Sequence, residues 1–356
     1  MTFFARQVAD KGDTAGHADR KVKAGSHIMT TSNGGTMCYS AQVVADYRKF
    51  VRTFGAIIDI HEFARLFFER TEGIGKAKVP KAMEGAFAEP QDEATREINA
   101  LIARFTSAQV TKLEQDLFKQ RTRLADAERT LQTKVTKAAT ESQRIATDKI
   151  AWVKGKLEDL QRTELQPRDS RIFPGNYAPV MVMESGQRVV KPMRYQCRIA
   201  GKPASYDTKY PGTYNARRDS LEGFWAPCFG YTHAVLLVEV FYENVSRAKY
   251  EGTLLETHER DENVVLEFRP GNGELMHVAC LWSRWSAPGE PDLLSFAAIT
   301  DEPPPEVAAT GHDRCIIPIK PENVDAWLNP SPNNLEAMYA ILDDRDRPYY
   351  EHRLAA

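Results

Sequence analysis

The pattern of apolar and polar positions divides the chain into a helical first half and a strand-rich second half. From Ala41 to about Thr71 the apolar residues recur every three or four positions, which predicts helices with a break at 54–59. After Pro167 the pattern changes to short apolar runs with a period of two, separated by Gly, Pro, Asn and Asp, which is typical of antiparallel strands. The predicted strands are 180–183, 234–242, 264–268, 277–282, 293–299 and 314–319. Two further helices are predicted near the C-terminal end, from Pro321 and from Asn334.

A segment with an unusual composition, 91–166, follows a predicted loop at 73–90. It contains no proline and a single glycine, Gly155, and its apolar residues approximate a heptad repeat among mixed charges. This pattern predicts one very long helix or a hairpin of two helices, with coiled-coil character. Its balanced charges favour a solvated face, and a surface for a protein partner or for self-association is the alternative.

Together these patterns predict an α+β fold with an antiparallel β core, peripheral helices and a long inserted helical arm. Residues 1–36 are rich in polar and small residues and are expected to form a disordered extension. Residues 37–356 are expected to form one domain, interrupted by the helical insertion at about 55–168. With 42% apolar residues, the chain can fill a core of this size.

Composition limits the classes of function. The formal charge of −2 argues against bulk electrostatic attraction to nucleic acid, so any such contact requires a local basic patch. No apolar stretch reaches the length of a membrane span, and no signal-peptide core precedes the first helix. The five cysteines form no CxxC pair, which suits a reducing cytoplasm without disulfides or a zinc site. A cytoplasmic protein without a metal or cofactor is expected. The cysteines are Cys38, Cys197, Cys228, Cys280 and Cys315.

The dipeptide Met37-Cys38 is the first candidate for chemistry. If the chain were shortened to begin at Cys38, that residue would carry a free α-amine and a thiol, whose ordinary pKa values are about 8 and about 8.5. The amine can form a Schiff base with an aldehyde, and the neighbouring thiol can then close a five-membered thiazolidine ring. A buried core cysteine after an incidental methionine is the alternative.

Other candidate residues lie in the strand-rich half. Glu243 follows a strongly apolar strand, where burial would raise its pKa and suit it to proton transfer, although an ordinary acidic turn residue is equally compatible. His312 precedes another apolar run and can transfer protons near neutral pH, or it is structural. The pair Arg217 and Arg218, next to Asn215, suits a phosphate or is a solvated turn. Trp282 and Trp285 could stack on bases or belong to the core.

The order of short motifs along the chain resembles the SOS response-associated peptidase (SRAP) family, the abasic-site processing proteins. The resemblance covers Met37–Ser40 and 171–330, and it depends on the following motifs in this order: Met37-Cys38, Asn176-Tyr177-Ala178-Pro179, Met193-Arg194-Tyr195, Asn215-Ala216-Arg217, Phe241-Tyr242-Glu243, Leu281-Trp282, Ile299-Thr300, His312-Asp313-Arg314 and Asp325-Ala326-Trp327-Leu328.

The resemblance implies a compact α+β fold that binds single-stranded DNA and captures the aldehyde of an abasic site through an N-terminal cysteine. It implies that Cys38 is the cross-linking residue, that Asn215 orients the cysteine and the opened sugar, and that Glu243 and His312 move protons. A lyase activity that cleaves the strand, or reversal of the cross-link, would depend on His312. The residues expected to contact DNA are Arg217, Arg218, Arg194 and Trp282.

The chain departs from the family pattern at three places. The family's Cys-Gly-Arg is Cys38-Tyr39-Ser40 here, so an arginine expected on the DNA backbone is missing. The family's Trp-Gly-Leu-Ile-Pro run is replaced here by residues 195–199. The helical segment between Cys38 and Asn176 is far longer than the connection found in the family.

Two other functions remain open from the sequence. In one, Cys38 acts as the thiol nucleophile of a peptidase, with His312 and Asn215, that cuts its own Met37–Cys38 bond. In the other, the helical arm is the functional part and the SRAP-like half is an inactive scaffold.

Overall fold

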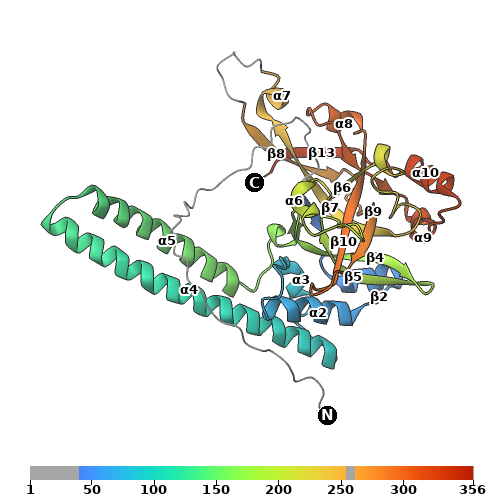
Figure 1. The fold of residues 1–356 in the computed structure, drawn as a ribbon. Coiled ribbons are helices and arrows are strands. Elements are labelled where there is room, and N and C mark those ends of the chain that lie inside the picture. Colours follow the sequence, from blue (N-terminus) through green and yellow to red (C-terminus); the bar gives the residue numbers. More distant parts are fainter. Residues whose placement is uncertain (1–39, 254–260, 356) are drawn as a thin grey trace, which may run out of the picture. The chain divides into compact units, whose positions relative to one another are not determined.

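The described part of the chain is residues 40–253 and 261–355 of a computed structural model (Figure 1). The chain divides into two units, residues 1–35 and 36–356, and every described residue belongs to the second unit. The extension expected to be disordered, and the candidate nucleophile Cys38, lie outside the described residues.

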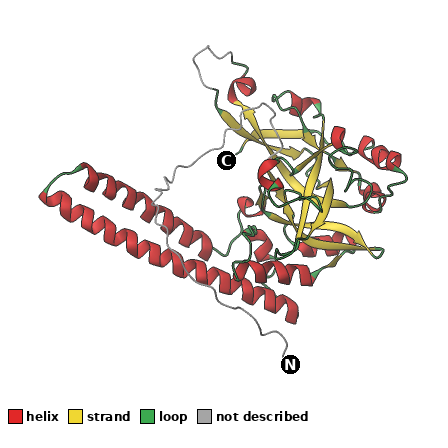
Figure 2. Ribbon diagram, viewed as in Figure 1, coloured by secondary structure: helices red, strands yellow, loops and turns green. Residues whose placement is uncertain are grey.

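Helices and strands are both abundant in the described residues, as Figure 2 shows. The α-helices are α1 (Tyr47–Phe54), α2 (Ile60–Thr71), α3 (Lys81–Gly85), α4 (Glu93–Thr133), α5 (Lys137–Gln161), α6 (Tyr206–Lys209), α7 (Arg247–Glu251), α8 (Pro305–Ala308), α9 (Val324–Leu328) and α10 (Leu335–Asp343). The strands are β1 (Ser40–Val43), β2 (Ile57–Ile58), β3 (Arg171–Ile172), β4 (Tyr177–Glu184), β5 (Gln187–Tyr195), β6 (Asn215–Arg217), β7 (His233–Ser246), β8 (Asn263–Pro270), β9 (Met276–Trp285), β10 (Leu293–Asp301), β11 (Cys315–Ile316), β12 (Pro318–Ile319) and β13 (Tyr350–Leu354).

The strands form one sheet that is mainly antiparallel. Its principal order is β12-β9-β10-β5-β4-β7-β1-β3, and β7 also pairs with β9, so five strands close into a ring. Parallel pairs occur where β5 and β6 lie beside β10 and where β2 lies beside β5. The second half of β7 is flanked by β1 on one edge and by β8 on the other. The predicted α+β fold with an antiparallel β core is confirmed.

The two faces of this sheet bury separate apolar clusters. Along β7, Leu236 and Val238 pack into the cluster inside the ring of strands, whereas Val235 and Leu237 pack into the cluster on the outer face. This alternation follows from the period of two in a strand, because successive side chains point to opposite faces. Helices α1, α9 and α10 cover the outer cluster, to which α9 contributes the fully buried Trp327.

The prediction of a helix from Ala41 is wrong at its beginning. Ser40–Val43 form strand β1, which pairs with β7 through Ala41 and Phe241 and with β3 through Ala41 and Ile172. The first helix begins only at Tyr47, where the Asp46 side chain caps its N-terminus. Pairing with two distant strands outweighs the local helical spacing, and the sequence pattern alone does not contain that information.

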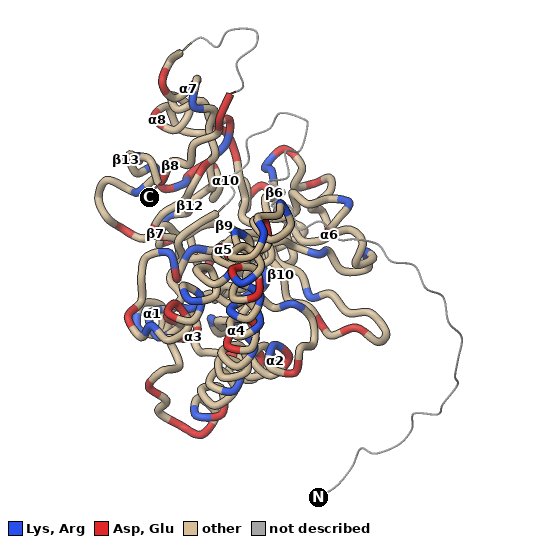
Figure 3. Tube along the Cα trace, turned by 90° about the vertical axis from the view of Figure 1, so that its left-hand side faces the viewer, with Lys and Arg blue, Asp and Glu red and all other residues tan. Residues whose placement is uncertain are grey.

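The segment 91–166 forms a hairpin of two helices rather than one very long helix. Helix α4 begins after Asp92, whose carboxylate accepts a hydrogen bond from the backbone N–H of Thr95 in a capping box, and residues 134–136 connect it to α5. Figure 3 shows acidic and basic positions alternating along both helices, in agreement with the predicted solvated face. Small or short apolar residues are buried in the contact between the two helices, namely Ala127, Ala139, Ala146 and Val153.

The base of this hairpin is anchored to neighbouring helices. Ile98 of α4 is fully buried in a third apolar cluster with Phe63 and Phe67 of α2 and with Met83 of α3. In the described ranges, no helix is both long and apolar enough to cross a membrane.

Candidate functional site

Glu243 and His312 form a buried pair on the inner side of the sheet. Glu243 lies on β7 between Phe241 and Val245, which both belong to the inner apolar cluster, and His312 lies in the loop before β11. The Nε2 atom of His312 is 2.9 Å from Oε2 of Glu243, and both side chains are fully excluded from solvent. The structure therefore brings together two of the four residues that the sequence proposes for catalysis.

The contacts of the two ring nitrogens of His312 indicate which of them carries a hydrogen. Its Nδ1 atom is 2.7 Å from the backbone oxygen of Arg314, a contact in which Nδ1 donates, and 3.3 Å from the backbone nitrogen of Arg314, a longer contact in which Nδ1 would accept. The shorter contact favours a hydrogen on Nδ1. Nε2 then faces the Glu243 carboxyl group with one shared proton, located on either the imidazole or the carboxyl group. Such a pair can give or take a proton at a buried site.

Burial and the neighbouring carboxyl group act in opposite directions on His312. Burial lowers the pKa of His312, but the hydrogen bond to Glu243 and the charge of that residue raise it by more, so the pKa lies above the ordinary 6.5. A group whose pKa is raised on folding stabilises the fold at low pH. That contribution is lost as the pH rises through the folded-state pKa.

We expect the titration of His312 to depend on Glu243. In a histidine-detected NMR titration, the ring of His312 should keep its proton at a pH where an exposed histidine has lost it, and Glu243→Gln should lower that midpoint. A His312 midpoint at or below the ordinary 6.5 in the wild-type protein would contradict this electrostatic account.

Asn215 points to the same inner side of the sheet. It lies on β6 beside Ala298 of β10, and the next residue, Ala216, packs into the outer cluster, so the Asn215 side chain points to the opposite face. Asn215 is buried, and its Oδ1 atom is 3.5 Å from the hydroxyl of Tyr195, at the long limit of a hydrogen bond. Asn215, Glu243 and His312 thus share one face of the sheet.

A small cavity lies in the inner cluster near these residues, but Asn215, Glu243 and His312 do not line it. Ser40 of β1, Tyr195 of β5, Phe241 of β7, Ala298 of β10 and Ile316 of β11 line it together with other apolar side chains. Phe241 is two residues before Glu243, Ala298 is the register partner of Asn215, and Tyr195 contacts Asn215. The described chain begins at Ser40, at the edge of this cavity, two residues after Cys38.

Two of the arginines expected to contact DNA lie together, each beside an acidic residue. Arg217 pairs with Asp219, and Arg218 pairs with Asp301 and with Asp343. Both arginines line a hollow of about 150 Å³ that also includes Asp313 and Arg314, which directly follow His312. The structure therefore brings this arginine pair next to the histidine loop.

The other two residues expected to contact DNA lie elsewhere on the sheet. Arg194 of β5 donates to Asp207 at 2.8 Å, and it shares this carboxylate with Arg198. Burial raises the pKa of Asp207, but the two guanidinium groups lower it by more, so Asp207 stays ionised. Trp282 of β9 is half-buried against the inner cluster, which agrees with the core alternative for this residue.

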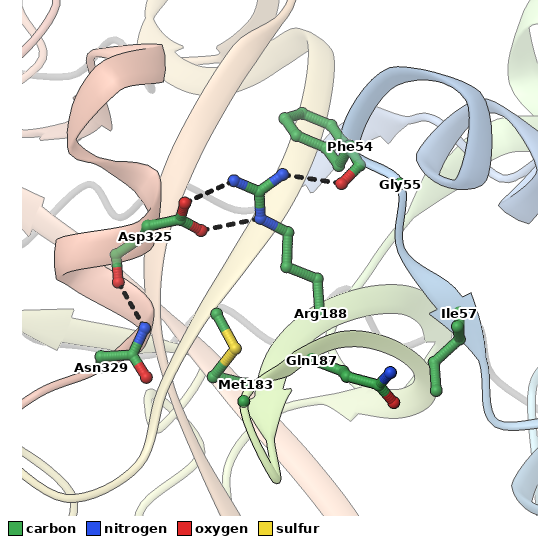
Figure 4. Close-up of a pocket in the computed structure, with 9 residues that line it drawn as sticks. Phe54, Gly55, Ile57, Met183, Gln187, Arg188, Asp325 and Asn329 are labelled. Carbon is green, nitrogen blue, oxygen red and sulfur yellow. Dashed lines mark hydrogen bonds and ion pairs between the residues drawn. The ribbon is translucent and has the colours of Figure 1, made fainter.

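A separate pocket near the β4–β5 hairpin, shown in Figure 4, has a structural explanation. The guanidinium of Arg188 makes two hydrogen bonds to the Asp325 carboxylate, at 2.7 and 2.6 Å, and donates to the backbone oxygen of Phe54 at 2.7 Å. These contacts join β5, α9 and α1. None of the residues proposed for the function lines this pocket. Within residues 40–253 and 261–355, no group of three or more His, Cys, Asp or Glu side chains could hold a metal ion.

Comparison with known families agrees with this geometry. The model of the SOS response associated peptidase (SRAP) family matches residues 123–353, which is more than half of the chain. The chain belongs to the SRAP family. Membership connects it with DNA-damage functions associated with the SOS response. The matched range includes Asn215, Glu243 and His312.

Comparison with individual proteins adds more distant similarities. No curated protein matches the chain. Among solved structures, a protein from Bordetella bronchiseptica has 14% sequence identity and a TM-score of 0.41, over 52% of this chain and 87% of that one. A protein from Bacteroides thetaiotaomicron has 12% identity and a TM-score of 0.41, over 52% and 77%. A phage-related protein from Bordetella bronchiseptica has 14% identity and a TM-score of 0.39, over 52% and 80%.

Two contacts near the candidate residues were not expected from the sequence. Tyr195 occurs in a motif used for the resemblance, but its contact with Asn215 was not expected. Arg171 lies on β3 and contacts Ser40, which is 131 residues away along the chain. Only the pairing of β1 with β3 brings them together, so no local pattern could have identified Arg171.

Proposed function

We propose that this SRAP protein captures the aldehyde of an abasic site in single-stranded DNA through the α-amine and thiol of Cys38. The observation that supports the proposal most is the buried Glu243–His312 pair, 2.9 Å apart, in which Glu243 belongs to β7, the strand that pairs with β1. Ser40 of β1 is the register partner of Tyr242, the residue before Glu243. Glu243 is therefore close to β1, the strand that follows Cys38 in the sequence.

Covalent geometry limits how far Cys38 can be from this pair. Two residues of extended chain span at most about 7 Å, so the Cα atom of Cys38 stays within that distance of the Ser40 Cα atom. Directly paired residues of antiparallel strands have Cα atoms about 5 Å apart. These limits allow the proposed nucleophile to reach the part of β7 that carries Glu243, which supports the proposal.

The proposed reaction needs one proton donor and one proton acceptor. The neutral amine of Cys38 attacks the aldehyde carbon, and the resulting carbinolamine loses water once a proton reaches its hydroxyl group. The thiol then adds to the carbon of the C=N bond and transfers its proton to nitrogen, which closes the thiazolidine. The sum is one aldehyde plus one cysteine giving one ring and one water, without a redox partner.

The residues divide this work according to their chemistry. The shared proton of Glu243 and His312 is given to the departing hydroxyl group, and the pair then takes a proton back from the nitrogen before the thiol adds. Asn215 has an amide that both donates and accepts, which suits it to orient the opened sugar. Because the bond to DNA is covalent, salt cannot reverse it, and a chain with a formal charge of −2 can perform the reaction.

A gel experiment tests this function. Protein that begins at Cys38 is incubated with a single-stranded oligonucleotide that contains one abasic site, and the products are separated under denaturing conditions. A slower band that contains both protein and DNA is expected, and it should be absent with an oligonucleotide without the abasic site. If folded protein with a free Cys38 gives no such band, covalent capture is rejected and the inactive-scaffold alternative remains.

The family description as a peptidase supports a second, linked proposal, in which the protein removes its own leader. In the printed chain the Cys38 amine forms the peptide bond to Met37, so capture requires cleavage there. We expect the intact mass of purified full-length protein to decrease by residues 1–37, and Glu243→Gln to prevent this loss. An unchanged mass after prolonged incubation of the wild-type protein would reject self-cleavage.

A further inference from the structure

The helical arm formed by α4 and α5 carries an excess of positive charge, in contrast to the chain as a whole. Residues 91–166 together are nearly balanced, but the part from Lys112 to Lys156 contains eleven Lys and Arg residues and only six Asp and Glu residues. Its formal charge is therefore +5, whereas that of the whole chain is −2. A segment with this excess attracts polyanions even when the complete protein does not.

Three cations of α4 form a row along the helix. Lys112, Lys119 and Arg123 are separated by seven and then four residues. Such spacings return a side chain to nearly the same side of a helix, because one turn takes 3.6 residues. Arg123 donates from Nε to the hydroxyl of Ser142 on α5, at 2.9 Å, so the row lies along the side of the arm where Ser142 is.

A second row lies on α5 and includes a tryptophan. Lys149 and Lys156 follow Ser142 by seven and fourteen residues, and Trp152 lies between them, three residues after the first and four before the second. These spacings place all three on the side of α5 that meets the row on α4. We refer to the two rows together as the basic face, which consists of Lys112, Lys119, Arg123, Lys149, Trp152 and Lys156.

The charges and the ring of the basic face are open to solvent. Trp152 is 59% exposed, although tryptophan is a highly buried residue on average. All four lysines are exposed, and in the described part of the chain only Lys119 has an acidic partner, Asp116 at 3.8 Å. Exposed pairs of this kind contribute little free energy, so the charge of the face stays available to a ligand.

We propose that the basic face binds single-stranded DNA as a second contact surface, an inference that does not require covalent capture. Its lysines and arginine attract the phosphates, and the ring of Trp152 offers a flat surface on which an unpaired base can stack. Cations that follow a backbone, combined with an aromatic platform, are typical of sequence-independent binding to single strands.

Two observations favour this ligand over other polyanions. The chain belongs to the SRAP family, whose functions concern DNA damage. The exposed ring favours an unpaired strand over a duplex, because a base in a duplex would first have to be unstacked, which costs free energy.

Two other roles of the basic face are distinguished by the experiment. If the face is only a solvated surface, its lysines affect DNA binding no more than other lysines of the arm. If it is a contact between two copies of the chain, Trp152→Ala changes the mass of the protein in solution.

The test measures binding of the full-length chain to a labelled oligothymidylate long enough to contact both the arm and the sheet. The oligonucleotide has no abasic site, so no covalent bond can form. Fluorescence anisotropy gives the association constant K over a series of salt concentrations. In the triple variant Lys112→Gln/Lys149→Gln/Lys156→Gln, the slope of log K against log salt should decrease in magnitude by about 2, which is about 0.7 for each of three phosphate contacts.

The same arm provides the matched controls. Lys134→Gln/Lys137→Gln/Lys154→Gln removes three exposed lysines of the arm that do not belong to the basic face, and it should leave the slope unchanged. Trp152→Ala should lower K by about 5-fold to 150-fold at an unchanged slope, which is the loss of one stacked base. Phe118→Ala removes an aromatic side chain of the arm that is 73% exposed and lies off the basic face, and it should change neither quantity.

These variants are expected to keep the fold, because each replaced side chain is exposed and glutamine has nearly the helix propensity of lysine. Circular dichroism and sedimentation of each variant check this. An unchanged slope in the basic-face variant would overturn the inference, and so would an equal decrease in both triple variants, which would indicate attraction by net charge alone. An unchanged K in Trp152→Ala, or a wild-type dimer that Trp152→Ala dissociates, would also overturn it.

The outcome is independent of the proposed function. A wild-type protein that forms no cross-link with abasic DNA, yet binds the oligothymidylate with a slope that depends on the basic face, would reject capture and keep this second surface. A wild-type protein that forms the cross-link, with identical slopes in all variants, would keep capture and reject the role of the arm.

Discussion

Replacing Cys38 with alanine is expected to eliminate the denaturation-resistant bond to abasic DNA. A Cys38→Ala protein whose chain begins at the substituted position keeps an α-amine, which can still form a Schiff base with the sugar aldehyde. Without the thiol, no thiazolidine can form, and the Schiff base hydrolyses when the protein is denatured. The measurement is the fraction of labelled oligonucleotide in the slower band, which should decrease to the background.

Two controls make the Cys38→Ala result specific. Adding borohydride during incubation reduces a Schiff base to a stable amine, so the Cys38→Ala protein should then regain a band if DNA binding and the amine are intact. Cys38→Ser preserves the size of the side chain and should give much less stable product than cysteine, because oxygen is the weaker nucleophile. A wild-type level of product in Cys38→Ala without borohydride would show that another residue captures the sugar.

Replacing Glu243 with glutamine is expected to slow capture by about 10²-fold to 10⁴-fold, the range typical of general acid–base catalysis. Glutamine has nearly the same size but cannot carry the shared proton, and it removes the charge that raises the pKa of His312. The rate constant for cross-link formation at saturating protein concentration measures the effect. The expected product is unchanged, because Glu243 moves protons and forms no bond to DNA in the proposed reaction.

Glu84→Gln provides the control for the loss of a largely buried ion pair. Glu84 on α3 pairs with Arg70 on α2, in the apolar cluster at the base of the helical hairpin, and neither residue is proposed to act in the reaction. Both substitutions should lower the melting temperature, but only Glu243→Gln should lower the rate constant. Equal rate constants for wild type and Glu243→Gln would reject the proton-transfer role of this carboxyl group.

The general architecture could be predicted because its signals are local. The period of two after Pro167 identifies most strands of the core, and the absence of proline in 91–166 identifies the helical hairpin. The position of the turn at 134–136 was not predicted, because neither proline nor glycine marks it, although the apolar repeat becomes irregular just after it. Strands β1, β2, β3 and β6 were missed because each is short and is stabilised by pairing with distant strands. Strands β5 and β13 were missed because charged residues interrupt their apolar positions.

The candidate site could be assembled from the sequence only in part. The motif order indicated Glu243, His312 and Asn215, and the structure brings the first two into contact and directs the third to the same face. The chain's own sequence could not show that Arg218 has acidic partners, since Asp301 and Asp343 come from distant elements. Arg171 depends on three strands meeting at Ser40, which no spacing along the chain indicates.

The most direct test of the central claim is a mass measurement on the product itself. Protein that begins at Cys38 is incubated with an abasic-site oligonucleotide, the DNA is digested to the attached sugar, and tandem mass spectrometry locates the modification. We predict a single modified residue, Cys38, with the mass of the sugar fragment added and one water lost, and with no thiol left to alkylate. A modification on a lysine, or a Cys38 whose thiol still reacts with an alkylating agent, would contradict capture by a thiazolidine.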